Sequence, residues 1–229
     1  MTRRFTLIDI ATAVAVAALL AGALWVVLHG PTEPLPMHFG ADGRPDRWGD
    51  RRELAGLLAF LAVIVGLTAG GLGVYAGRAT DPARRRGLRL GQLVSLIVIG
   101  SIAPFLTWQI LSTASQPAAA PAIVTLVWPM GFLAFVCLTL GAVLGRIPPN
   151  IAIGVRTAWS LKSRLAWDRS NRLMGRLLFW LGLGGLVATP AAPQPLGLWV
   201  MVAGILLSGV AAIFESWRVW RTDSNRQPF

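Results

Sequence analysis

Short polar or proline-rich stretches divide the chain into six long apolar runs, and this division constrains the fold more than any other feature. A helix rises about 1.5 Å per residue, so roughly 20 apolar residues cross the hydrocarbon core of a bilayer. Only 14% of the residues are charged, against about a quarter in a soluble domain. We therefore predict an all-α, polytopic membrane protein with six transmembrane helices. The predicted spans are residues 10–28, 54–75, 90–111, 122–144, 173–192 and 196–214.

The fifth predicted span has a short uninterrupted apolar run. Its uninterrupted apolar part, residues 177–188, has 12 residues and would form about 18 Å of helix. To cross the bilayer, this helix must include Arg176, whose guanidinium would extend toward the headgroups.

The distribution of lysine and arginine predicts the orientation, because these residues are concentrated on the cytoplasmic side of membrane proteins. With six spans and a cytoplasmic N-terminus, 17 of the 21 Lys and Arg residues face the cytoplasm and the other four lie in the first external loop. We therefore predict that both termini are cytoplasmic. This distribution accounts for the net charge of +11, and we predict no direct binding of nucleic acid.

The external loop, residues 29–53, is rich in proline, glycine, carboxylates and arginine. Its prolines and glycines disfavour a helix and favour successive turns, with Asp42-Gly43 and Pro45-Asp46 as good turn formers. His38, Asp42 and Asp46 are residue types that bind Zn²⁺, but their spacing is loose and no histidine or cysteine pair supports a site. We therefore favour a folded, hydrogen-bonded loop over a metal site, and we predict no cofactor.

The motif segment, residues 146–176, lies between the fourth and fifth predicted spans. It contains seven of the 21 Lys and Arg residues, two tryptophans and two asparagines. Pro148, Pro149 and Asn150 would end the fourth span sharply. Ser160 or Ser163 would then cap a helix that continues into the fifth span.

A helical wheel separates two stripes on this helix. The first stripe is basic and consists of Lys162, Arg169 and Arg176. The second, on the opposite side, consists of Trp167, Asn171, Met174 and Leu178. Topology alone accounts for most of the basic charge, although the first stripe also suits anionic headgroups or an acidic partner. The second stripe would bury Asn171, whose amide then needs a partner, either Asn150 or a carbonyl freed by the Pro-Pro turn.

The motif segment resembles the signature of the SdpI family of bacterial membrane proteins. The stretch PPNIAIGVRTAWSLKSRLAWDRSNRLMGRLLF, residues 148–179, has an Asn, a Gly-x-Arg-Thr, a Trp-Ser-Leu, a later Trp, an Asn and a Gly-Arg entering a helix. The resemblance assigns these positions to the family's cytoplasmic motif: Asn150, Gly154, Arg156, Thr157, Trp159, Trp167, Asn171 and Arg176. Ala158 stands where a proline is common in the family.

The external loop carries a second resemblance. The stretch LPMHFGADGRPDRWGDR, residues 35–51, is similar to a small uncharacterised membrane domain often found N-terminal to the SdpI family. The similarity includes His38 and the pair Pro45-Asp46. The two resemblances together imply an N-terminal two-span unit, residues 1–76, and an SdpI-like four-span unit, residues 77–229.

The family resemblance implies immunity to a secreted, membrane-active peptide toxin. The toxin would be met from outside, near the external loop and the spans. The family also implies a receptor role, in which a transcriptional repressor is held at the membrane when toxin is bound. The expected partners are therefore the lipid bilayer, a secreted peptide and a cytoplasmic repressor, with the protein in the bacterial cytoplasmic membrane.

Two other functions remain open at this point. A small transporter or channel is disfavoured because no charged residue lies mid-span; Asp9 and Glu215 lie at predicted cytoplasmic ends. A membrane enzyme would need a catalytic constellation, which only His38 with Asp42 or Asp46 could supply. We therefore predict no enzymatic activity.

Overall fold

The computed structural model describes residues 5–115, 122–149 and 153–226. These residues form helices joined by loops, with one two-stranded β-hairpin, so the predicted all-α membrane class is confirmed. Five helices are long and apolar enough to cross a membrane, and the chain is a multi-pass membrane protein. They are α1 (Leu7–His29), the continuous helix Arg51–Arg78, α4 (Pro82–Ala114), α5 (Ala122–Leu144) and α7 (Leu196–Thr222).

The helix predicted as the fifth span, α6 (Arg164–Ala188), is not among these five. It begins earlier than predicted, and its first half is charged. The charged residues of that half are Arg164, Asp168, Arg169, Arg172 and Arg176. At about 1.5 Å per residue, its 25 residues are about 37 Å long. The helix therefore has the length to cross a bilayer, but its apolar half does not.

The residues form two compact units, Met1–Leu126 and Val127–Phe229. The division between them lies within α5, whereas the division expected from the resemblances lies between residues 76 and 77, inside α3 (Gly71–Arg78). The difference arises because α4 packs on the helices that precede it. The expected division concerns similar sequence regions rather than packing, and it stays a prediction.

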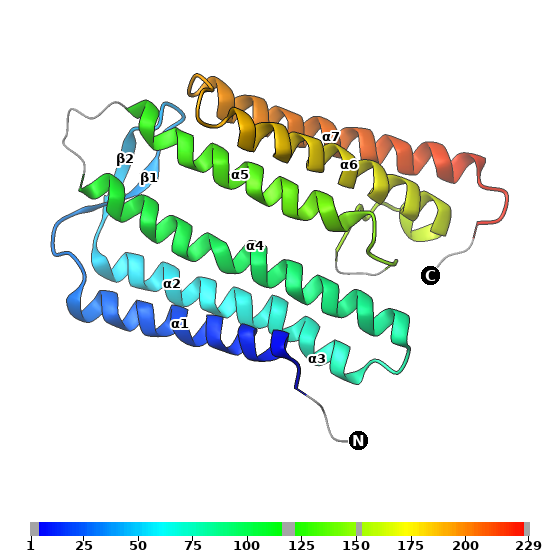
Figure 1. Ribbon diagram of the computed structural model, residues 1–229, viewed down its shortest axis with the longest axis horizontal. Coiled ribbons are helices and arrows are strands. Elements are labelled where there is room, and N and C mark those ends of the chain that lie inside the picture. The colour runs from blue at the N-terminus through cyan, green and yellow to red at the C-terminus, as the bar shows by residue number, and fades with distance from the viewer. Residues whose placement is uncertain (1–4, 116–121, 150–152, 227–229) are drawn as a thin grey trace. The chain divides into compact units, whose positions relative to one another are not determined.

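The first unit packs α1, α2 (Arg51–Val65) and α4 around one apolar core, and Figure 1 shows these helices side by side. Val26, Leu54 and Ala103, one from each helix, are buried in this core. The second predicted span contains a π-helical turn, η1 (Gly66–Gly70), between α2 and α3. The start of α2 is fixed by Asp50, whose Oδ1 accepts hydrogen bonds from the backbone N–H groups of Arg52 and Glu53, both at 2.9 Å.

The external loop contains an antiparallel hairpin of β1 (Leu35–Phe39) and β2 (Pro45–Gly49). The predicted turn at Asp42-Gly43 is confirmed, because Gly43 has φ of 81° and its N–H donates to the Gly40 carbonyl. The predicted turn at Pro45-Asp46 is wrong, because these residues begin β2. Proline is tolerated at the first position of a strand, where its missing N–H leaves no ladder bond unmade. Leu35 is 1% exposed and anchors the hairpin in the helical core.

A polar cluster joins α1, α3 and α4 at the end of the first unit opposite the hairpin. Asp9 Oδ1 accepts hydrogen bonds from Arg89 Nη1 at 2.6 Å and from Gln92 Nε2 at 3.0 Å. Gly73 of α3 lies against this cluster, where an added Cβ would be 2.6 Å from Gln92 Nε2. The Asp9 carboxylate is therefore paired within the protein.

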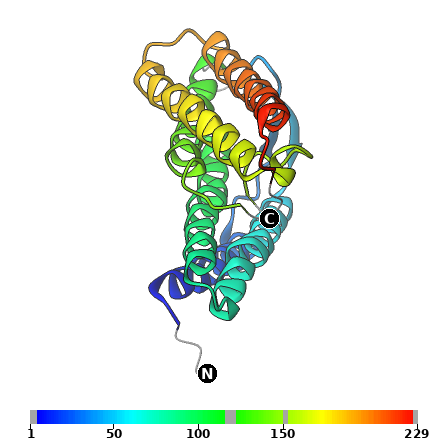
Figure 2. The same ribbon diagram turned by 90° about the vertical axis from the view of Figure 1, so that its right-hand side faces the viewer.

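The second unit consists of the rest of α5, the short 3-10 helix η2 (Ser160–Lys162), α6 and α7. Figures 1 and 2 show α5, α6 and α7 as long neighbouring helices. Glycines let α5 and α6 approach closely: a Cβ added to Gly141 would overlap the backbone nitrogen of Phe179, and one added to Gly182 would overlap that of Leu138. Small residues at such crossings are typical of packed membrane helices.

Candidate functional site

The motif segment connects α5 to α6 through η2, and it is described except for residues 150–152. Asn150, a predicted site residue, lies outside the described residues. The helix predicted from Ser160 or Ser163 begins after Ser163, whose Oγ accepts a hydrogen bond from the Ala166 N–H at 3.0 Å. The same hydroxyl donates to Asp223 Oδ2 at 2.5 Å. The start of α6 is thus attached to the end of α7.

Trp167 and Asn171 form the buried centre of the motif segment, with exposed fractions of 0% and 1%. The Trp167 indole Nε1 donates to the Ile147 carbonyl at 3.1 Å, just before the Pro-Pro turn. Asn171 Oδ1 accepts from the Val155 N–H at 2.8 Å, and Nδ2 donates to the Trp167 carbonyl at 2.9 Å. The predicted burial of Asn171 is confirmed. Its described partners are the Val155 N–H and the Trp167 carbonyl rather than a carbonyl of the Pro-Pro turn, and the other expected partner, Asn150, lies outside the described residues.

Gly154 lies directly on this buried centre. Its φ is +127°, a backbone conformation that side chains other than glycine's rarely adopt. An added Cβ would be 2.7 Å from Asn171 Oδ1 and 2.8 Å from Trp167 Cη2. The glycine is therefore required for both conformation and space.

A hydroxyl cluster fixes the next turn of the motif segment. Ser160 Oγ accepts from the Thr157 N–H at 2.9 Å and donates to the Val155 carbonyl at 2.6 Å. Thr157 Oγ1 lies 2.8 Å from Ser216 Oγ of α7 and accepts from the Ser160 N–H at 3.0 Å. Thr157 therefore links the motif segment to α7. Ser160 and Ser216 have no place in the predicted site, and their sequence signal is weak because serine is common at turns.

The remaining motif residues do not join the buried centre. Arg156 is exposed, and within the described residues its guanidinium has no hydrogen bond, ion pair or ring contact. Trp159 is half-buried at the start of η2, and Arg176 lies on the exposed side of α6. The structure thus separates motif residues that hold the fold from those that remain available for contacts.

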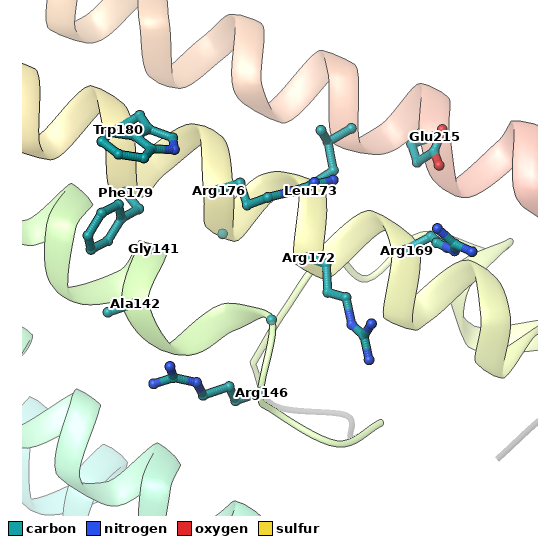
Figure 3. A pocket seen from close by; sticks show the side chains of 12 residues that line it. Gly141, Ala142, Arg146, Arg169, Arg172, Leu173, Arg176, Phe179, Trp180 and Glu215 are labelled. Carbon is teal, nitrogen blue, oxygen red and sulfur yellow. The ribbon is translucent and has the colours of Figure 1, made fainter.

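A pocket of about 660 Å³ opens where α5, α6 and α7 meet (Figure 3). Arginines dominate its polar lining: Arg146 after α5, and Arg169, Arg172 and Arg176 from α6. Only Arg176 belongs to the predicted motif. The wheel of α6 places Arg169 beside Arg176, but it contains no information on the approach of Arg146 from α5.

The predicted external-loop residues are only partly brought together. His38 Nδ1 lies 2.5 Å from Asp46 Oδ1 across the exposed hairpin. Asp42 instead accepts a hydrogen bond from the Arg44 N–H at 3.1 Å, within the turn. Pro45 begins β2. Within residues 5–115, 122–149 and 153–226, no group of three or more His, Cys, Asp or Glu side chains is arranged to hold a metal ion.

Residues 146–216 match the model of the SdpI/YfhL protein family. No curated protein and no solved structure matches the chain. The matched region contains the buried centre of the motif segment, the arginines of the pocket and most of α7. It ends at Ser216, whose hydroxyl contacts Thr157 near its other end. The match confirms the resemblance seen in the motif: residues 146–216 of the chain are similar to the SdpI/YfhL family.

Proposed function

We propose that this protein gives resistance to a secreted, membrane-active peptide toxin in the bacterial cytoplasmic membrane. The observation that carries the proposal is the family match, which coincides with a folded polar segment inside an otherwise apolar chain. Buried asparagine and tryptophan side chains bonded to the backbone specify one conformation for this segment. A segment that served only to set topology by charge would not need that conformation.

The proposal assigns a different role to each side of the membrane. The toxin is met outside, at the hairpin of residues 35–49 and the adjacent helices. The motif segment faces the cytoplasm and carries the response, which includes holding a transcriptional repressor at the membrane. Arg156 is the best placed motif residue for such a contact, because it is exposed and free of interactions within the described residues.

The proposed role is not enzymatic. The pair His38 and Asp46 lies exposed on a hairpin, and Asp42 is engaged with the backbone of its own turn. Transport has less support than immunity, because the carboxylates of α1 and α7 are paired near helix ends. Asp9 pairs with Arg89, and Glu215 pairs with Arg218.

Immunity is tested by expressing the chain in a host sensitive to the peptide encoded beside its gene. Survival should rise with the amount of protein in the membrane, relative to cells with an empty vector. Unchanged killing at a verified membrane level would contradict the proposal. The repressor role is tested separately, by asking whether a DNA-binding protein encoded nearby moves to the membrane fraction when the peptide is added.

The replacement Arg156→Gln should abolish the response without unfolding the protein. Its side chain is exposed, so we expect a change in the free energy of unfolding within about 0.5 kcal/mol. Arg164→Gln is the matched control, because it removes the same charge from an exposed position that is not one of the eight family motif residues. Survival should fall only for Arg156→Gln. Equal survival of the two variants would show that the exposed motif arginine does not carry the response.

A further inference from the structure

The pocket at the junction of α5, α6 and α7 has an excess of positive charge. Four arginines line it, and within the described residues none of their guanidinium groups has a hydrogen bond or salt bridge. Figure 3 shows Arg169, Arg172 and Arg176 extending from α6 and Arg146 extending from the end of α5. Arginines concentrated around a concave site are a typical recognition site for anions.

The carboxylate at this pocket does not neutralise the excess charge. Glu215 accepts two hydrogen bonds from Arg218, from Nε at 2.8 Å and from Nη2 at 2.9 Å. Glu215 also attracts the charges of Arg169 and Arg176, but this neighbourhood contains one carboxylate and five guanidinium groups. The pocket therefore retains a net positive charge.

The helix crossing holds the arginines together. Gly141 lies on α5 and Gly145 follows directly after its last residue, Leu144, and both face α6. An added Cβ at Gly145 would lie 3.4 Å from Arg172 Cα, and one at Gly175 would lie 3.0 Å from the Gly141 carbonyl oxygen. Since the backbones are this close, Arg146 and Arg172 approach the same pocket from different helices. Packing of the helix backbones thus places the four exposed arginines around one pocket without a counterion.

The wall next to the arginines is apolar and aromatic. Phe179 and Trp180 line the pocket beyond Arg176, and their rings pack edge to face at 5.5 Å between centroids. Trp180 is 66% exposed on this side of α6. Phe179 and Trp180 belong to the apolar half of α6 that follows Arg176, and exposed tryptophan is typical of the membrane interface. A ligand for this pocket therefore combines an anionic group with an apolar chain.

We propose that this pocket binds the phosphate group of an anionic membrane lipid. The arginines donate hydrogen bonds to the phosphate oxygens, and the lipid chain packs along Phe179 and Trp180. Guanidinium groups match phosphate geometry in a bidentate way, and basic pockets between membrane helices suit phosphate headgroups. This site goes beyond toxin immunity, and binding requires neither a toxin nor a repressor.

The test uses the full chain purified in a neutral detergent and three probes. Phosphatidic acid carries both phosphate and chains, diacylglycerol carries the chains alone, and inorganic phosphate carries the anion alone. Native mass spectrometry should show phosphatidic acid retained and diacylglycerol lost, with inorganic phosphate bound more weakly. Retention of diacylglycerol equal to that of phosphatidic acid would overturn the proposal. If inorganic phosphate bound as tightly as phosphatidic acid, the pocket would be a phosphate site, but the proposal that its ligand is a lipid would be contradicted.

The arginines are tested by the double variant Arg172→Gln/Arg176→Gln. We expect the dissociation constant for phosphatidic acid to rise about tenfold for each arginine, which corresponds to about 1.4 kcal/mol each. The matched control is Lys162→Gln/Arg164→Gln, which removes the same charge from exposed positions near the start of α6. The proposal would be overturned if both double variants weakened phosphatidic acid binding equally, or if neither weakened it.

A second variant tests the pocket independently, in case the first variant does not fold. Arg146→Gln changes the pocket from the α5 side, outside α6, and should weaken phosphatidic acid binding by a similar factor. Helix content and thermal unfolding without lipid are measured for each variant. Loss of binding with unchanged unfolding supports the site, whereas folded variants that bind phosphatidic acid like the unaltered chain contradict it.

Discussion

Replacing Trp167 with alanine should reduce the free energy of unfolding of the second unit by about 3–5 kcal/mol. The side chain is completely buried, so its removal leaves a large cavity beneath Gly154. The replacement also leaves the Ile147 carbonyl without the indole N–H that lies 3.1 Å away. A buried acceptor that loses its donor adds to the cost of the cavity. Thermal or denaturant unfolding in detergent measures the change.

The matched control for this replacement is Trp180→Ala on the same helix. Trp180 is 66% exposed, and its removal should cost less than about 1 kcal/mol. If the two replacements destabilised the protein equally, the proposed central position of Trp167 in the motif segment would be incorrect.

The replacement Gly141→Ala should separate α5 from α6. Its Cβ would overlap the backbone nitrogen of Phe179 and would lie 2.8 Å from the Gly175 carbonyl oxygen. Backbone atoms cannot move aside as a side chain can, so the helices themselves must shift. Overpacking of this kind costs about 1–3 kcal/mol or more. Because the crossing aligns the arginines, phosphatidic acid binding should be lost together with stability.

Gly184→Ala provides the comparison on α6. No neighbouring atom lies within 4 Å of a Cβ added at Gly184. Alanine is the better helix former by about 1 kcal/mol, so this replacement should leave stability unchanged or raise it slightly. A similar loss of stability in Gly141→Ala and Gly184→Ala would mean that the close crossing is not what the glycines provide.

The helices were largely predictable from local chemistry. The fourth predicted span coincides with α5, Ala122–Leu144, because its apolar run has sharp ends. The serine cap of α6 and the burial of Trp167 and Asn171 follow from periodicity and capping preference, and the structure confirms them. The helices α4 and α7 extend past their apolar runs, because a helix can continue into water once its charged residues face solvent.

Other features depend on contacts between distant residues. The strands of the hairpin carry Pro36 and Pro45, so local propensity favours turns, whereas the anchoring of Leu35 in the helical core favours a paired strand. The pocket requires Arg146 and the arginines of α6 to meet. The spacing Gly141-x-x-x-Gly145 could have indicated the crossing that brings them together, but it is not among the predictions made from the sequence. That spacing is a recognised sequence signal for close helix packing.

The measurement that most directly tests the proposed immunity is the peptide concentration that kills half of a sensitive culture. It is compared between cells with the chain, with Arg156→Gln, with Arg164→Gln and with an empty vector, at matched amounts of membrane protein. We predict that the chain and Arg164→Gln raise this concentration several-fold and that Arg156→Gln does not. The same killing concentration with the chain as with the empty vector would contradict the proposed function.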